Sequence, residues 1–296
     1  MTRRTHAFGL DLTLPLAVRG LPARDPAPGL PRLVVTLGGA ADVDRAWGAR
    51  DAQPLVRGPG LVVEAADGAY RLDWHGVGIF VLPGDGRLVC TAEPGGGERW
   101  ERVLLAQVLP LAATVAGVEV LHASAVAVDG TALAIAGPAR AGKSTLACAL
   151  TERGADFLAD DAVGLTRGGA GITVHPGPAL ARVAAAPDEP ADPAGKAGRE
   201  MGGRADPCEL GALYLLRRAD DVAEPTFEPG AGFAALAAAT FNLLDQTPAR
   251  LTRQLDLCAD LEGSGRVWRA ALPASVAPAD AADLLARHLG SARQGR

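Results

Sequence analysis

The chain has 296 residues, of which 48% are hydrophobic and 21% are charged, and its formal net charge at pH 7 is −5. This length suits one large or two modest globular domains, and the apolar share is ample for a sizeable core. The negative charge and the scattered arginines predict no nucleic-acid partner.

The cysteines and the apolar segments indicate the compartment. The cysteines are Cys90, Cys148, Cys208 and Cys258. They lie far apart and form no C-x-x-C pair, so neither a zinc site nor a disulfide framework is indicated. Asp11 interrupts the only apolar stretch near the start, which argues against a signal peptide. The longest uncharged run, Val103 to Val118, has 16 residues, short of the roughly 20 that a membrane helix needs. We expect a cytoplasmic protein with no membrane partner.

Residues 1–97 predict a small β-rich N-terminal domain. Short apolar or alternating runs are separated by turn residues: Phe8 to Leu16, Leu33 to Leu37, Leu61 to Glu64, Tyr70 to Trp74, Gly78 to Leu82 and Arg87 to Thr91. Residues 66–69 and 83–86 carry Asp-Gly and Gly-Asp-Gly hairpin turns. Nothing in this domain can be tied to chemistry, and His75 is read as a structural residue.

The next segment predicts a bridge of residues 98–119. Apolar residues at helical spacing from Glu98 to Val118 favour one long helix, bent at Pro110. Residues 120–128 then read as a strand, and 131–136 as a second strand after an Asp-Gly turn. Period-2 alternation places His122 and Ser124 on one face of the first strand.

A phosphate-binding pattern follows. The stretch Gly137-Pro138-Ala139-Arg140-Ala141-Gly142-Lys143-Ser144 fits G-x-x-x-x-G-K-[ST], between a buried strand and a predicted helix from Ser144 to Arg153. Glycines let backbone N–H groups approach phosphates, and a helix N-terminus favours negative charge. Lys143 would reach the β- and γ-phosphates and Ser144 would hold Mg²⁺. We expect residues 137–145, Thr145 included, to bind a nucleoside triphosphate; an ordinary glycine-rich turn is the alternative.

Two adjacent carboxylates end the strand after this helix. Residues 154–161 predict a largely apolar strand, with Asp156 near its start, that ends on Asp160 and Asp161. Ligands of open α/β sheets bind beyond the carboxyl ends of strands, so at least one carboxylate should lie beside the phosphates, as a base or an Mg²⁺ ligand. The alternative is a turn or helix-cap pair. Residues 163–165 and 172–174 predict a hairpin that ends at His175, which is read as a turn residue.

Residues 184–208 predict a long loop. They are rich in Ala, Pro and Gly and carry three cations, Lys196, Arg199 and Arg204. One interpretation is a lid that brings these cations onto the phosphoryl group when it closes, and the other is a solvent-exposed surface loop. The remaining elements are a central strand, three helices and a further strand: Leu210 to Leu216, Ala231 to Leu244, Pro248 to Leu261, Asp280 to Leu289, and Arg266 to Leu272.

The phosphate loop alone does not name a reaction. The sequence has no Asn-Lys-x-Asp motif for guanine recognition and no Leu-Ser-Gly-Gly signature of ATP-driven transporters. A carboxylate beside the γ-phosphate is what a kinase needs in order to take the proton from an attacking hydroxyl.

A family resemblance adds to this interpretation. The runs 121–125, 137–144, 152–154 and 159–161 resemble the catalytic domain of HPr kinase/phosphorylase, with 15 positions from His122 to Gly137 and 17 from Lys143 to Asp160. The resemblance implies an α/β, P-loop kinase core of the HPr kinase/PEP carboxykinase-like type over residues 120–290. It also implies ATP and Mg²⁺ as cofactors. Asp160 would be the general base, Asp161 and Ser144 would contact Mg²⁺, Lys143 would neutralise phosphates and His122 would support the carboxylates, with the division between Asp160 and Asp161 left open.

The N-terminal domain and the region after His175 differ from full-length HPr kinase/phosphorylase. The layout is similar instead to HPr-kinase-like tailoring enzymes that phosphorylate a serine of a lasso-type precursor peptide. We therefore expect a serine kinase whose partner is a peptide or small protein with an acceptor serine. A kinase of a free amino acid or other small hydroxyl compound, and a nucleotide-binding regulatory module with little turnover, are the alternatives. The oligomeric state stays open, a homo-oligomer included.

Overall fold

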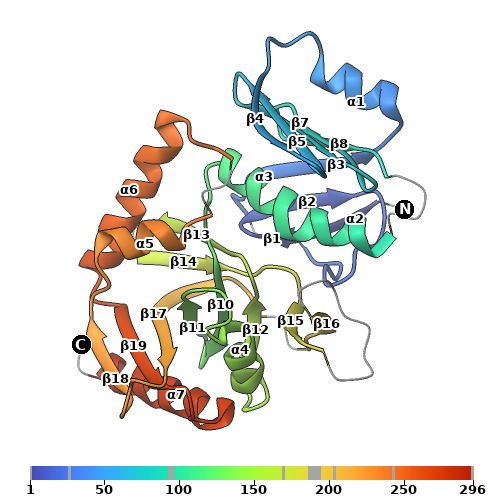
Figure 1. Cartoon of the computed structure of the whole chain (residues 1–296). Coiled ribbons are helices and arrows are strands. Elements are labelled where there is room, and N and C mark those ends of the chain that lie inside the picture. The colour runs from blue at the N-terminus through green and yellow to red at the C-terminus, as the bar shows by residue number, and fades with distance from the viewer. Residues whose placement is uncertain are drawn as a thin grey trace. The chain divides into compact units, whose positions relative to one another are not determined.

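The computed structural model describes residues 2–25, 28–92, 97–168, 171–185, 195–202, 205–241 and 244–294. The chain divides into two compact units. The first comprises residues 1–118 and 242–251, and the second comprises residues 119–241 and 252–296. Both units combine a β-sheet with helices (Figure 1). No helix in the described ranges is long and apolar enough to cross a membrane.

The first unit is built on an eight-stranded sheet with the order β1-β2-β3-β8-β7-β6-β5-β4. The strands are β1 (Arg3–Ala7), β2 (Leu10–Leu14), β3 (Arg32–Leu37), β4 (Gln53–Gly58), β5 (Leu61–Ala66), β6 (Ala69–Trp74), β7 (Gly78–Leu82) and β8 (Arg87–Cys90). Helix α1 (Ala40–Trp47) packs Val43 and Trp47 against Val81 and Val89 of this sheet. The β-rich character expected of this part of the chain is confirmed.

Several details of this unit differ from the prediction. The hairpin turns at residues 66–69 and 83–86 are confirmed. The run Phe8 to Leu16 contains one strand, β2, which starts only at Leu10 because Phe8 and Gly9 adopt positive φ (54° and 77°) and form the turn that joins it to β1. The strands β1 and β4 and the helix α1 were not predicted. The signal for α1 is local: Asp42 accepts a hydrogen bond from the backbone N–H of Gly39, which caps the helix.

The helical segment that follows is not one regular helix. It consists of α2 (Gly97–Val103), a π-helical turn η1 (Leu104–Val108) and α3 (Leu109–Val115). The irregularity precedes Pro110, since the N–H of Leu109 bonds to the carbonyl of Leu104 and Pro110 stands in the first turn of α3. Residues 98–118, expected as a bridge, belong to the first unit.

The second unit carries a larger sheet with the order β12-β10-β11-β17-β14-β13-β9. Strand β19 also pairs with β17, and β18 pairs with β19. Strands β11, β17 and β19 are parallel to one another. Helices α4 and α7 cover one face of the sheet and α5 and α6 the other (Figure 1). The strands are β9 (Glu119–Leu121), β10 (Ala123–Val128), β11 (Thr131–Ala136), β12 (Asp156–Ala159), β13 (Val163–Gly168), β14 (Gly171–His175), β17 (Cys208–Ala219), β18 (Thr226–Pro229) and β19 (Val267–Pro273). The helices are α4 (Lys143–Thr151), α5 (Phe233–Ala239), α6 (Pro248–Gly263) and α7 (Pro278–Gln294).

Most elements of this unit were predicted, and three predictions were wrong. The run 120–128 is interrupted at His122, so β9 and β10 are separate strands. The helix expected over residues 231–244 is the shorter α5. The segment 184–208 is not a loop throughout, because β16 (Lys196–Glu200) pairs with β15 (Leu180–Ala184) in a two-stranded ribbon.

Candidate functional site

Strand pairing brings three chain segments to one edge of the sheet of the second unit. The last residue of β11, Ala136, lies opposite the first residue of β10, Ala123. The last residue of β12, Ala159, pairs with Ala125 of β10. The phosphate loop after β11, His122 before β10 and the carboxylates after β12 therefore leave the sheet side by side.

Two glycines shape the phosphate loop. Gly137 has φ of 149°, and a Cβ there would lie 2.5 Å from the carbonyl oxygen of Leu216 in the neighbouring strand β17. Gly142 has φ of 95° and caps helix α4, whose first hydrogen bond runs from the N–H of Leu146 to the carbonyl of Gly142. The preceding N–H groups of α4 have no intrahelical partner, so they are donors available to an anion.

Lys143 lies along the start of this loop. Its side chain is largely buried, and Nζ donates hydrogen bonds to the carbonyl oxygens of Gly137 (2.9 Å) and Pro138 (3.3 Å). Burial lowers the pKa of Lys143, the charges of Asp161 and Asp160 oppose that shift, and the charge of Lys196 adds to it. The ammonium group thus lies within the electrostatic reach of both carboxylates and of a second cation.

Asp160 is fixed inside the protein. Its residue is 7% exposed, Oδ1 accepts a 2.5 Å hydrogen bond from the hydroxyl of Ser124, and Oδ2 accepts a 2.7 Å bond from the backbone N–H of Arg182. Both carboxylate oxygens are therefore held in place by groups that are themselves part of strands β10 and β15.

Asp161 is placed differently from its neighbour. Its side chain is 43% exposed and its φ is 69°, in the left-handed region that few non-glycine residues adopt. Nδ1 of His122 lies 2.9 Å from the backbone carbonyl oxygen of Asp161 and 3.5 Å from its Oδ1. Because the carbonyl oxygen can only accept, Nδ1 carries the proton and donates it to the Asp161 backbone, and the carboxylate of Asp161 lies close to the same ring nitrogen.

Two of the three cations of the predicted lid, Lys196 and Arg199, lie on the ribbon formed by β15 and β16. The ribbon packs on α4 and β12 through Ala181, Cys148 and Phe157. Burial lowers the pKa of Lys143, and the positive charge of Lys196 lowers it further. Burial raises the pKa of the Cys148 thiol, and the positive charge of Arg199 partly offsets that rise. Arg204 lies outside the described residues.

Ser124 and the backbone of Arg182 are the partners of Asp160 that sequence reasoning missed. Alternation placed Ser124 on the same face as His122, but the break between β9 and β10 buries Ser124 and leaves His122 exposed. His175, expected as a turn residue, is instead the buried last residue of β14, and its Nε2 lies 2.7 Å from the hydroxyl oxygen of Thr166.

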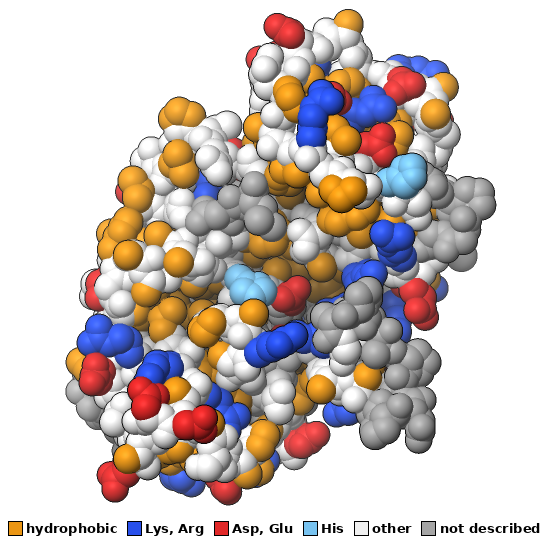
Figure 2. Space-filling view, in the orientation of Figure 1, with side chains coloured by type: hydrophobic (Ala, Val, Ile, Leu, Met, Phe, Trp, Pro, Cys, Tyr) orange, Lys and Arg blue, Asp and Glu red, His pale blue; other side chains and the backbone are white. Residues whose placement is uncertain are grey.

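A pocket of about 550 Å³ adjoins the phosphate loop. Its lining combines His122 and Gly137–Pro138 with the ends of β17 and β19, strand β18 and a row of alanines on α5. The charged groups at its rim are paired: Arg269 with Glu228 at 3.0 Å, and Arg217 with Asp221. Figure 2 likewise shows positive and negative side chains interspersed over the face of this unit that it presents.

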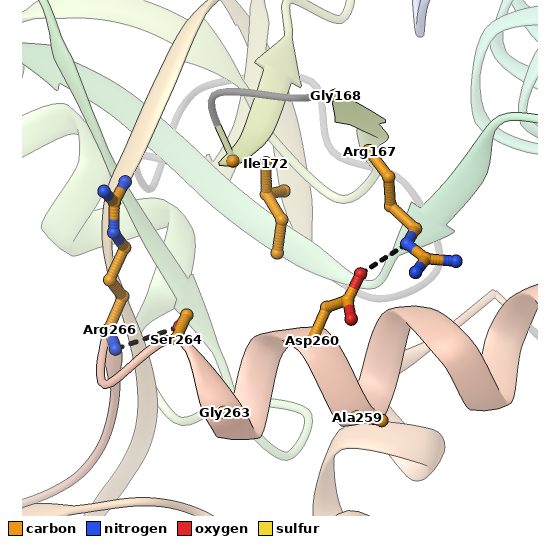
Figure 3. Close-up of a pocket in the computed structure, with 9 residues that line it drawn as sticks. Arg167, Gly168, Ile172, Ala259, Asp260, Gly263, Ser264 and Arg266 are labelled. Atoms are coloured by element: carbon orange, nitrogen blue, oxygen red, sulfur yellow. Dashed lines mark hydrogen bonds and ion pairs between the residues drawn. The ribbon is translucent and has the colours of Figure 1, made fainter.

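A second pocket, of about 650 Å³, lies at the other end of the sheet. Figure 3 shows Arg167 reaching Asp260 of α6 across it, and Ser264 accepting a hydrogen bond from the backbone N–H of Arg266. Arg266 also pairs with Glu209 at 2.6 Å, at the start of β17. The phosphate loop lies at the opposite end of β17, so this pocket is separate from the site.

The donors at the site fit Mg²⁺. Magnesium prefers hard oxygen ligands and binds through one or two carboxylates together with substrate phosphates. Ser144 on α4 and the two aspartates supply such oxygens. Within the described residues, no group of three or more His, Cys, Asp or Glu side chains forms a cage for a metal ion on its own.

Comparisons with known proteins add a distant likeness. No family model matches the chain, and no curated protein matches it. Among solved structures, it is similar to the HPr(Ser) kinase/phosphatase from Coxiella burnetii, with 15% sequence identity and a TM-score of 0.37. The match covers 58% of this chain and 97% of that one. A likeness at this TM-score assigns no function, so the following proposal rests on the geometry of the site.

Proposed function

We propose that the protein is an ATP-dependent kinase that transfers the γ-phosphate to a serine hydroxyl of a peptide or small protein. The observation that carries this proposal is the strand pairing that sets the loop of Lys143 beside the carboxylates after β12, where the partly exposed side chain of Asp161 lies next to His122. A phosphate loop binds the donor, and an accessible base beside it can activate an acceptor hydroxyl.

The phosphate loop supplies most of the electrostatic stabilisation. Backbone N–H groups of residues 139–145, which include the N-terminus of α4, would hold the β- and γ-phosphates, and Lys143 would neutralise them. Ser144 and Asp160 would hold Mg²⁺, which when bound neutralises charge on the phosphate oxygens. Lys196 and Arg199 on the ribbon add positive charge on the side of Asp160.

The geometry supports Asp161, rather than Asp160, as the base. Asp160 is buried and both its oxygens already accept hydrogen bonds. The side chain of Asp161 is partly exposed, and His122 bonds to the backbone carbonyl of the same residue. In the proposed step, the serine oxygen bonds to the γ-phosphorus and its proton passes to the Asp161 carboxylate. The bond from the γ-phosphorus to the β–γ bridging oxygen breaks, and ADP leaves.

The acceptor class extends the proposal. The layout of the chain is similar to that of tailoring kinases acting on lasso-type precursor peptides, and we propose that a serine of such a peptide is the acceptor. The experiment is intact-mass analysis after incubation with Mg²⁺-ATP and, in turn, a precursor peptide ending in serine, HPr and free serine. A gain of about 80 Da identifies the acceptor.

Asp161→Asn tests the mechanism. Removing the general base should slow transfer by about 10²- to 10⁴-fold, while binding of a fluorescent ATP analogue persists. Asp156→Asn is the matched control, because Asp156 is an exposed carboxylate at the other end of the same strand. Retention of the full rate in Asp161→Asn would show that Asp161 is not the base, and failure of the wild type to bind the analogue would overturn the kinase proposal itself.

A further inference from the structure

The pocket of about 550 Å³ beside the phosphate loop is the strongest unassigned feature of the second unit. Its volume lies within the range of small-ligand sites. Two features bear on its occupant: which end of the bound nucleotide it adjoins, and the chemistry of its walls.

The orientation of Lys143 indicates the end of the nucleotide that faces the pocket. In phosphate loops the lysine reaches the β- and γ-phosphates, while the nucleoside lies beyond the α-phosphate. Nζ of Lys143 lies against the carbonyls of Gly137 and Pro138, and these two residues also line the pocket. The γ-phosphate end of the loop therefore opens toward the pocket.

His122 links the pocket to the proposed base. It lines the pocket and orients Asp161. Its backbone N–H also donates a 2.7 Å hydrogen bond to the carbonyl oxygen of Ala239, at the end of α5. At the start of α5, the backbone N–H groups of Ala231 and Gly232 bond to the carboxylate of Glu262 on α6. The helix that forms one wall is thus anchored at both ends.

The walls are apolar and leave room for a bulky group. Six alanines line the pocket: Ala231, Ala235, Ala238, Ala239, Ala270 and Ala271. The rim cations are engaged by Glu228 and Asp221 within the chain. A ligand in this pocket would consequently be recognised by the apolar surface that it buries, and not by an ion pair with a rim arginine.

We infer that this pocket binds the acceptor, and that it holds a bulky apolar side chain adjacent to the serine that is phosphorylated. The inference rests on the proposed function and specifies its substrate. Binding of that side chain would bring the neighbouring hydroxyl to the γ-phosphate end of the loop, between Lys143 and Asp161.

The test compares two pentapeptides that end in Phe-Ser and Ala-Ser. Calorimetric titration of the full chain without nucleotide should show about ten- to a hundredfold tighter binding of the Phe-Ser peptide, as burial of an aromatic side chain predicts. Ala235→Phe fills the pocket and should abolish that preference. Ala234→Phe is the matched control, because Ala234 is an exposed residue of the same helix outside the pocket lining and should leave the preference intact.

Binding of a fluorescent ATP analogue provides the second readout. All three proteins should bind it equally. Equal affinity of the wild type for the two peptides would overturn the inference. So would a loss of ATP-analogue binding in Ala235→Phe with peptide binding unchanged, because the pocket would then hold the nucleoside. Discrimination between the peptides without phosphate transfer would leave the pocket assignment standing and overturn the kinase proposal.

Discussion

The hydrogen bond between Ser124 and Asp160 makes a quantitative prediction. The hydroxyl of Ser124, on a residue that is 0% exposed, donates to a carboxylate oxygen at 2.5 Å. Hydrogen bonds to charged groups contribute about 1.5 to 3 kcal/mol, and a buried acceptor that loses its donor bears the cost of desolvation. Ser124→Ala should therefore destabilise the second unit by about 1.5 to 3 kcal/mol.

Scanning calorimetry measures this effect. For a unit of this size each kcal/mol lowers the unfolding midpoint by about 2 to 4 °C, so Ser124→Ala should lower it by about 3 to 12 °C. Ser264→Ala is the control, since that hydroxyl donates to the neutral carbonyl of Leu261 at 2.6 Å in the same unit. It should cost no more than about 1.5 kcal/mol.

A double-mutant cycle isolates the pair. In an Asp160→Asn background the hydroxyl can only bond a neutral amide, so Ser124→Ala should cost about 1 kcal/mol less there than in the wild type. A change below about 0.5 kcal/mol for Ser124→Ala in the wild type would refute the reasoning, because Asp160 would then not depend on Ser124.

Two further predictions concern the phosphate loop and alkaline pH. Gly137→Ala should abolish binding of an ATP analogue, because its Cβ would meet the Leu216 carbonyl at 2.5 Å; Gly154→Ala, also at positive φ but with open space around it, should cost about 1 kcal/mol and leave binding unchanged. Equal binding by the two variants would contradict this account of the loop. Burial raises the pKa of three thiols: Cys90 to about 12, and Cys148 and Cys208 to about 11. The unfolded chain loses these protons from about pH 9 while the folded chain keeps them, so stability is fully present below pH 9 and falls as pH rises toward 11 to 12. Denaturant unfolding at pH 8 and 10.5 should show a loss of about 1.4 kcal/mol per pH unit from Cys90 and less from the two more accessible thiols; a flat profile would refute it.

Local chemistry explains which parts of the fold were predictable. The Asp-Gly pair at residues 67–68 determines its hairpin, because both residues adopt positive φ. Continuous apolar runs were sufficient to predict β11 and β17. The wrong predictions fall where a local pattern is overridden: Phe8 takes a positive φ that its side chain disfavours, and His122 interrupts an apolar run that otherwise predicts a single strand.

The sequence by itself was enough to predict a loop of the phosphate-binding type between β11 and α4 and a carboxylate pair after β12, because both patterns are made of residues that are adjacent in the chain. Tertiary structure alone decided the environments of the two aspartates. Ser124 meets Asp160 across 36 positions, and only the pairing of β10 between β11 and β12 creates that contact. The apolar pocket likewise depends on α5 lying against the ends of β17 and β19. The physical reason is that burial, which separates a fixed carboxylate from an accessible one, is a property of packed elements and not of the order of residues.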